Sequence, residues 1–387
     1  MFKIQTLNKI SATGLAQLGE GFTISDNEAN PDAIILRSFK MHDMELPGGL
    51  LAVARAGAGV NNIPIDKCSE KGIVVFNTPG ANANAVKELV ICGLMLSSRK
   101  VWQGINWAQT LKGKEDVPAL VEKGKGDFGG VEILGKTMGI IGVGGAIGVL
   151  TANACNALGM KVIGSDPYLS DKAKAALDPA VTVCNLDEVL AKSDYISINV
   201  PYSAATKHMI NAEALKKCKK GVVVLNFARA ELVDDAALKA ALAEGSVSVY
   251  VTDFPNSEHL DVENIIAIPH LGASSEEAEE NCALMAAAQT RDFLQKGNIV
   301  NSVNFPALSS DTPGKLRSGI VYKADAENAV GARIKAEFAA KNDKFEFNNA
   351  VRGNYGYALV VFEGDSCNGA CDVIRAMPEV IMARSIR

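Results

Sequence analysis

The sequence predicts an α/β protein in which doubly wound parallel sheets fill residues 1–306 and a small α+β unit follows. Short β-branched runs alternate with helix-length segments, which is typical of parallel strands joined by crossover helices. The later strands are apolar almost throughout, as expected when helices cover both faces of a sheet. The alternation stops near Ala307, where LSSDTPGK has the composition of a linker. A chain of 387 residues is long enough for two or three domains.

Two series of strands are expected. The first lies at KIQTL, AIILRS, LLAVAR and GIVVFNT, and a helix follows over residues 82–98, where apolar residues recur at helical spacing. The second lies at TMGIIGV, KVIGSD, VTVCN, YISINV, GVVVLNF, SVYVTDF and IIAIPH. A further helix is expected from Ser274 to Gln295, because Ser-Ser-Glu-Glu is a helix-start signal. Beyond the linker, the order strand, helix, two strands, helix, strand predicts a ferredoxin-like unit over residues 315–387.

Composition excludes several classes of protein. The net charge of −5 argues against a general nucleic-acid or anionic-membrane binder, since these depend on a basic surface. The sequence shows neither a secretory leader nor an apolar run long enough to span a membrane, so we expect a cytoplasmic protein. Cys92, Cys155 and Cys282 are expected to be buried. A disulfide between Cys367 and Cys371 stays open, although two reduced thiols are the favoured interpretation.

A glycine-rich turn indicates a nucleotide site. The segment GIIGVGGAIGVLTANACNALGMKVIGSD predicts a strand, a turn with Gly142, Gly144 and Gly148, a helix from about Ile147, and a second strand ending at Asp166. Glycines let the backbone approach a pyrophosphate, which the first N–H groups of the helix, at Ala146 and Ile147, can bind. Asp166 can accept hydrogen bonds from ribose hydroxyls and would repel a 2′-phosphate, so NAD is favoured over NADP. The turn is one residue longer than G-x-G-x-x-G, and a turn without a ligand is the alternative.

Isolated polar residues follow three later strands: Arg229 after VVVLNF, Asp253 and Glu258 after VYVT, and His270 after IIAIP. Oxidation of a hydroxyl beside a carboxylate needs a base, which histidine can supply. A carboxylate on the far ring nitrogen would favour the imidazolium, and arginine can bind the substrate carboxylate through two hydrogen bonds. Each residue alone would more often be structural or solvated, and their joint occurrence after a nucleotide motif favours catalysis. His42 and His208 are expected at the surface, and His259 is a weaker rival for the base.

These segments, with GIVVFNTPGANANAV and ARAGAGVNNI upstream, resemble the D-isomer-specific 2-hydroxyacid dehydrogenases over roughly residues 1–305. The resemblance implies a Rossmann-type nucleotide domain over residues 99–270, inserted in a split flavodoxin-like substrate domain of residues 1–98 and 271–306. It also implies that Arg229, Glu258 and His270 are the catalytic set and that Asp253 lies near the nicotinamide. Further cofactor contacts are expected at Pro201, Ala228 and Gly272.

Within the family, the chain is most similar to the branch that oxidises D-3-phosphoglycerate at the entry to serine synthesis. The phosphate of such a substrate needs cations, and the candidates are Arg37, Lys40 and Arg55, with the N–H groups of Ala56 and Gly57 in the ARAGAG segment. For Arg37 and Lys40, plain surface charges are an equal alternative. No metal is implied. A homo-oligomer, dimer or tetramer, is expected because the family pairs its nucleotide domains.

The unit at residues 315–387 resembles an ACT domain, in which serine can act as an effector. Its helix reads ADAENAVGARI and keeps Glu327, Asn328 and Gly331, but lacks the His and Pro found in many serine-regulated members, so serine control stays open. Two other functions also stay open. The substrate could be another 2-hydroxy acid, such as glycerate, glyoxylate or lactate. The second is an NAD-sensing scaffold protein built on the same fold, which the compact C-terminal unit makes the less favoured interpretation.

Overall fold

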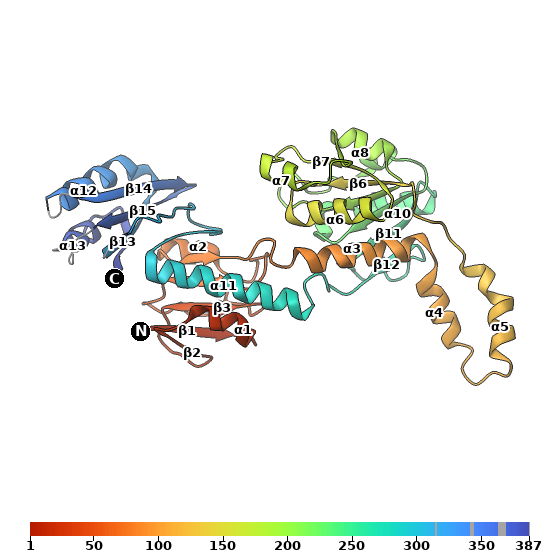
Figure 1. Cartoon of the computed structure of the whole chain (residues 1–387), viewed down its shortest axis with the longest axis horizontal. Helices are drawn as coiled ribbons and strands as arrows, with labels where there is room; N and C mark the ends of the chain where they lie inside the picture. The colour runs from red at the N-terminus through yellow and green to blue at the C-terminus, as the bar shows by residue number, and fades with distance from the viewer. Residues whose placement is uncertain (314–315, 341–343, 363–368, 387) are drawn as a thin grey trace. The chain divides into compact units, whose positions relative to one another are not determined.

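The computed structural model describes residues 1–313, 316–340, 344–362 and 369–386. The chain divides into two compact units (Figure 1): unit 1 comprises Met1–Asn82 with Glu276–Arg387, and unit 2 comprises Ala83–Ser275. Each parallel sheet belongs to one unit, and a third, antiparallel sheet belongs to unit 1. The predicted α/β class is confirmed. Among the described residues, every helix is too short or too polar to span a lipid bilayer.

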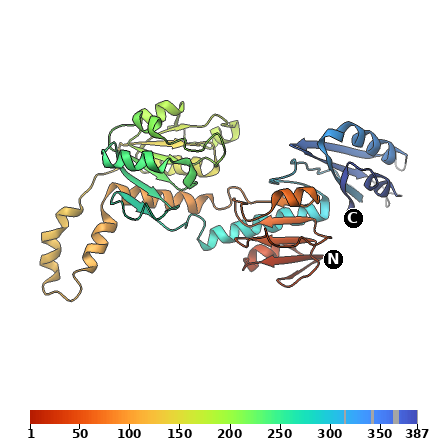
Figure 2. The same ribbon diagram turned by 180° about the vertical axis from the view of Figure 1, so that it is seen from behind.

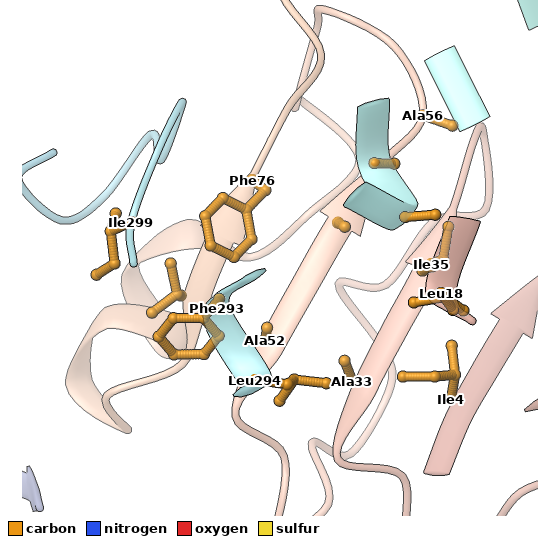
Figure 3. Close-up of a cluster of buried hydrophobic side chains, with 14 of the residues drawn as sticks. Ile4, Leu18, Ala33, Ile35, Ala52, Ala56, Phe76, Phe293, Leu294 and Ile299 are labelled. Atoms are coloured by element: carbon orange, nitrogen blue, oxygen red, sulfur yellow. The ribbon is translucent and has the colours of Figure 1, made fainter. Parts of the chain in front are cut away.

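Unit 1 begins with a five-stranded parallel sheet of order β2-β1-β3-β4-β5, the flavodoxin-like order. Its strands are β1 (Phe2–Leu7), β2 (Phe22–Ser25), β3 (Ala33–Leu36), β4 (Ala52–Arg55) and β5 (Val74–Phe76), with helices α1 (Ala12–Leu15), α2 (Ile65–Glu70) and α11 (Glu276–Lys296). Helix α11 covers one face with small and aromatic side chains (Figure 3). The ring of Phe293 meets that of Phe76 edge-on, with centroids 5.6 Å apart.

Unit 2 is built on a seven-stranded parallel sheet of order β12-β11-β10-β9-β6-β7-β8. Its strands are β6 (Thr137–Ile141), β7 (Lys161–Ser165), β8 (Thr182–Val183), β9 (Tyr195–Ile198), β10 (Val222–Asn226), β11 (Val247–Thr252) and β12 (Ile265–Ala267). Helices α3 (Ala83–Ser98) and α6 (Ala146–Ala157) cover one face, and α8 (Leu186–Lys192), α9 (Ala212–Lys216) and α10 (Asp235–Ala243) cover the other; α7 (Asp171–Ala176) follows β7. The chain order reverses between β6 and β9, and such a switch point is where doubly wound sheets bind ligands.

Helix α3 belongs to unit 2, although the sequence prediction assigned residues up to 98 to the substrate domain. Its buried residues Val86, Val90 and Leu94 share one apolar cluster with Met138 and Ile140 of β6. The division of the chain therefore falls after Asn82 and Ser275 in the structure, rather than after residues 98 and 270. Apolar periodicity identifies the helix, but it does not show which sheet the apolar face will cover.

Two helices of unit 2, α4 (Val101–Gln109) and α5 (Val117–Gly124), form a hairpin that extends away from the sheet (Figures 1 and 2). Neither helix has a buried residue. The hairpin is held by local aromatic packing, because the ring of Trp107 lies 5.1 Å from that of Phe128.

The C-terminal part of unit 1 has the predicted βαββαβ order. It contains β13 (Leu316–Lys323), α12 (Glu327–Ala339), β14 (Phe345–Arg352), β15 (Tyr355–Phe362), α13 (Ala370–Arg375) and β16 (Val380–Ile386). The sheet is antiparallel, in the order β14-β15-β13-β16. Helices α12 and α13 cover one face, and the other face packs into the core beside α11 through Val321, Tyr357, Leu359 and Val361. This sheet is therefore part of the hydrophobic core of unit 1.

Polar contacts at the end of α11 reinforce this packing. The buried guanidinium of Arg384 on β16 donates to the carbonyl oxygens of Phe293 and Leu294 and stacks on the Phe293 ring at 4.3 Å. A cation is favourable there because the last carbonyls of a helix carry partial negative charge. Beside it, the hydroxyl of Tyr357 donates to the carbonyl oxygen of Gly297 at 2.6 Å.

The cysteines only partly match expectation. Cys155 and Cys282 are buried, but Cys92 is exposed, so the expectation of a buried Cys92 was wrong. Cys92 lies on α3 between two residues of the apolar face, where helical geometry turns it away from the sheet. Cys371 is buried, and Cys367 lies outside the described residues.

We predict that Tyr357→Phe lowers the free energy of unfolding by about 1–2 kcal/mol, because it leaves the buried Gly297 carbonyl without its donor. Urea unfolding of the full chain measures this. Tyr355→Phe is the matched control, because the structure describes no hydrogen bond for the Tyr355 hydroxyl. An equal loss in both variants would show that the Tyr357 hydrogen bond is not responsible.

Candidate active site

The turn from β6 into α6 requires glycine at two positions. Gly142 has a φ of +84°, and a Cβ there would lie 2.6 Å from the carbonyl oxygen of Asn199. A Cβ on Gly148 would lie 2.1 Å from the carbonyl oxygen of Gly142. The residue that lengthens the motif, Gly145, is the N-cap of α6 and donates its N–H to the Gly142 carbonyl at 3.2 Å. The longer loop therefore keeps the close approach of strand and helix.

Among the described residues, the first turn of α6 has no side-chain cap for its N–H groups. The helix begins at Ala146, one residue before the predicted Ile147, and its N-cap glycine has no side chain to accept from the first turn. First-turn N–H groups and the positive end of the helix dipole are suited to a pyrophosphate. The N–H groups of Ala146 and Ile147 therefore fit the role predicted for them.

Asp166 lies beside this turn, directly after β7. Its two oxygens accept the N–H groups of Gly144 at 3.0 Å and of Tyr168 at 2.9 Å. These bonds fix the carboxylate next to the glycine loop and leave lone pairs that can accept ribose hydroxyls. The geometry suits NAD, whereas a 2′-phosphate would meet a negative charge.

Arg229 and His270 both lie against the ring of Phe254. The imidazole of His270, which is exposed just after β12, has its centroid 4.5 Å from that of the Phe254 ring. Arg229 lies just after β10, and its guanidinium carbon is 5.7 Å from the centroid of the Phe254 ring. Arg229 is further fixed by a bond from its Nη1 to the Ala228 carbonyl at 2.6 Å. Sequence reasoning missed Phe254, which immediately follows the predicted Asp253.

Asp253, at the end of β11, is a buried carboxyl group. Its side chain is 1% exposed, and among the described residues neither oxygen has a hydrogen-bond partner of good geometry. Burial raises the pKa of Asp253 from an ordinary 3.8 to about 6, against the lowering effect of the Gly272 N–H and of Arg229. Burial dominates because the charged form loses hydration that these neighbours do not replace. Such a perturbed carboxyl group is typical of functional sites.

Glu258 and its neighbour His259 are both held by α10. The carboxylate of Glu258 forms an ion pair with Lys239, which lowers the pKa of Glu258. The imidazole of His259 is 2% exposed, and its Nε2 lies 3.0 Å from a carboxylate oxygen of Asp235. Its Nδ1 accepts the Asn256 N–H at 3.4 Å. A buried histidine with both nitrogens engaged is poorly placed to meet a substrate, unlike the exposed His270.

The remaining predicted cofactor residues lie at the same sheet edge. The N–H of Ala228 donates to the side chain of Asn226 at 3.2 Å, and Gly272 is buried beside Asp253. Pro201 is exposed, and its carbonyl accepts the Thr206 hydroxyl at 2.8 Å. His42 and His208 are exposed, as expected.

In unit 1, the structure brings two of the three predicted cations together. The Nε of Arg55 donates to the Arg37 carbonyl at 3.2 Å, so both arginines lie where β3 and β4 end. Ala56 is buried, and Gly57, with a φ of +148°, lies so close to the Arg55 guanidinium that a Cβ would clash with it. Lys40 is exposed, and no described contact joins it to the arginines.

Comparison with known proteins agrees with this geometry. Residues 94–272 match the family model described as "D-isomer specific 2-hydroxyacid dehydrogenase, NAD binding domain". The NAD-binding domain of this chain belongs to that family. The sheet order, the glycine turn and Asp166 described above are the structural parts of such a domain.

Relatives extend the similarity to most of the chain. D-3-phosphoglycerate dehydrogenases of Methanocaldococcus jannaschii and Mycobacterium tuberculosis are 34% and 33% identical over 69% and 85% of this chain. The chain spans only 50% and 63% of the length of these two relatives. Among solved structures, NAD⁺-bound 3-phosphoglycerate dehydrogenase of Entamoeba histolytica is 26% identical, with a TM-score of 0.62 over 79% of this chain and 99% of that one. The D-mandelate dehydrogenase of Rhodotorula graminis, 20% identical over 79% of this chain and 98% of its own, shares the fold with a TM-score of 0.66.

We predict that Asp253→Asn stabilises the protein without NAD at pH 8 and has little effect near pH 4. The folded state retains a proton on Asp253 up to about pH 6, whereas the unfolded chain loses it near pH 4. This carboxyl group therefore disfavours folding increasingly as the pH rises through that window, by a total on the order of 3 kcal/mol. Thermal unfolding at several pH values measures the effect. Asp43→Asn, at an exposed site, is the control. A gain that is equal at pH 4 and pH 8 would contradict the prediction.

Proposed function

We propose that the chain is an NAD-dependent dehydrogenase that oxidises D-3-phosphoglycerate to 3-phosphohydroxypyruvate, with His270 as the general base. The observation that carries this proposal is that Arg229 and His270 both contact the ring of Phe254, at the carboxyl edge of the NAD-binding sheet. A cation and an imidazole held by one rigid ring suit a substrate with a carboxylate next to a hydroxyl.

The residues would divide the chemistry as follows. Arg229 binds the substrate carboxylate and thereby orients the carbon that bears the hydroxyl. His270 takes the hydroxyl proton as the C–H bond gives up its hydride. Bound NAD supplies the acceptor for that hydride. Glu258, which Lys239 keeps ionised, stabilises the imidazolium of His270 electrostatically.

The phosphorylated substrate is favoured over other acids by the arginines of unit 1. Arg37 and Arg55 lie together at adjacent strand ends, as a phosphate site requires. The names of the relatives point the same way. Glycerate, glyoxylate and lactate lack the phosphate group that these two arginines would bind.

The test is NAD reduction, followed at 340 nm, with D-3-phosphoglycerate and with other 2-hydroxy acids. We expect turnover of phosphoglycerate and a fall in kcat of about 10²- to 10⁴-fold in His270→Ala, with NAD affinity unchanged. His42→Ala, at an exposed site, is the matched control. Turnover of an unphosphorylated acid instead would overturn the substrate. NAD binding without turnover of any acid would favour the scaffold interpretation.

The C-terminal unit is proposed to be ACT-like, because its strand order and its two helices on one face are those of a ferredoxin-like unit. Control by serine or another amino acid stays a prediction. Glu327, one of the residues that keep the ACT pattern, accepts a hydrogen bond from Asn349 at 2.7 Å.

The hairpin of α4 and α5 supports the proposed homo-oligomer. It exposes the apolar side chains of Val101, Trp102, Ile105 and Val117, of which Ile105 is 55% exposed. Exposed apolar side chains on two helices that have no buried residue of their own are typical of a surface covered by a partner. We propose that the partner is a second copy of this chain.

We predict that Ile105→Asp converts the oligomer into monomers, because the contact would have to bury an unpaired charge. Sedimentation velocity measures the change. Lys112→Asp, in the loop of the same hairpin, should leave the mass unchanged. A monomeric wild type, or an oligomeric Ile105→Asp variant, would refute the proposed surface.

A further inference from the structure

The backbone around Arg37 is unusually well fixed. Three successive N–H groups, of Arg37, Ser38 and Phe39, donate to the side-chain oxygen of Asn8 at 3.2, 3.1 and 2.9 Å. The Arg37 carbonyl accepts the Arg55 Nε at 3.2 Å and the Asn62 side-chain amide at 3.0 Å. Asn8 after β1, Arg55 at the end of β4 and Asn62 in the loop after β4 therefore hold the backbone from which the Arg37 side chain extends.

That side chain already has a partner. A carboxylate oxygen of Glu279 lies 2.7 Å from Nη1 of Arg37, and the two side chains are 43% and 32% exposed. Glu279 belongs to the first turn of α11, where the helix dipole favours a negative charge. Both residues of this ion pair extend from well-held backbone: Arg37 from the hydrogen-bonded loop, and Glu279 from the 21-residue helix α11.

We propose that Glu279 is a specificity-determining residue, which neutralises Arg37 in the free protein and competes with the anionic group of the substrate for it. The inference rests on the proposed function in assigning Arg37 to the substrate phosphate. It adds that binding at Arg37 is an exchange of one anion for another.

The consequence follows from charge. The free energy with which an anion binds Arg37 is the attraction of that anion to the guanidinium, less the attraction of Glu279 that it replaces. A phosphate monoester carries nearly two negative charges at neutral pH, so it competes better than a carboxylate or chloride ion. Once it is bound, the retained carboxylate of Glu279 still repels it. An acid without a phosphate does not reach Arg37 and is unaffected.

The test begins with inorganic phosphate as the probe and the full chain as the sample. We expect Glu279→Gln, which keeps the shape of the side chain, to bind phosphate about five- to tenfold more tightly by isothermal titration calorimetry, as loss of one half-exposed competing charge implies. Glu277→Gln, at an exposed position in the same helical turn, should leave the affinity unchanged. In the double variant Arg37→Met with Glu279→Gln, the gain should disappear.

Steady-state kinetics provide a second test. In Glu279→Gln, we expect the KM for D-3-phosphoglycerate to fall by the same factor while kcat and the KM for D-glycerate stay unchanged. A merely structural role would alter both KM values. Phosphate affinity that is unchanged or weaker in Glu279→Gln, or an equal gain in Glu277→Gln, overturns the inference. Tighter phosphate binding without turnover of any acid would leave the inference intact and refute the proposed function.

Discussion

Parallel strands end at one edge of their sheet, and this constraint places nearly every candidate functional residue of the chain. Helices cover both faces of the two parallel sheets, so the strands are largely apolar, and the charged candidate residues lie where a strand stops. Asp166, Arg229, Asp253 and His270 each follow a different strand of unit 2, and Arg37 follows β3 of unit 1. Residues far apart in the chain thus meet because their strands are neighbours in the sheet.

The pair Asp253–Phe254 shows how two adjacent residues serve different needs at this edge. The ring of Phe254 contacts both the guanidinium of Arg229 and the imidazole of His270, so it brings a cation and an imidazole to the same part of the edge. The carboxyl group of Asp253 is buried with both oxygens unsatisfied among the described residues, which costs folding free energy. A buried polar group that destabilises the free protein is better explained by the bound state than by stability.

The sequence predicted the order of helices and strands well, because apolar runs and glycine-rich turns are both local patterns. Apolar runs located β6 through β12, and the glycine turn with Asp166 located the nucleotide site. Strand β2 was missed because three of its four residues, Thr23, Ile24 and Ser25, are exposed at the sheet edge, so no apolar run marks it. Three features depend on contacts between distant segments: the packing of α3 on the sheet of unit 2, the contact of His259 with Asp235, and the contacts of Arg229 and His270 with Phe254. Local patterns contain no information about such contacts.

The partners of two charged residues, Arg37 and Glu258, likewise could not be predicted from local patterns. From the sequence, Arg37 and Glu258 read as charges available to a ligand or to a catalytic histidine. In the structure each is paired with an opposite charge from a helix, Glu279 of α11 and Lys239 of α10. A ligand or an imidazolium that pairs with either residue would have to compete with the ion pair already there, so the net free energy would be a small difference between two attractions. Selectivity in such a site depends on how much better the ligand competes than the residue already there, so the charge of the incoming group matters more than the number of cations that surround it.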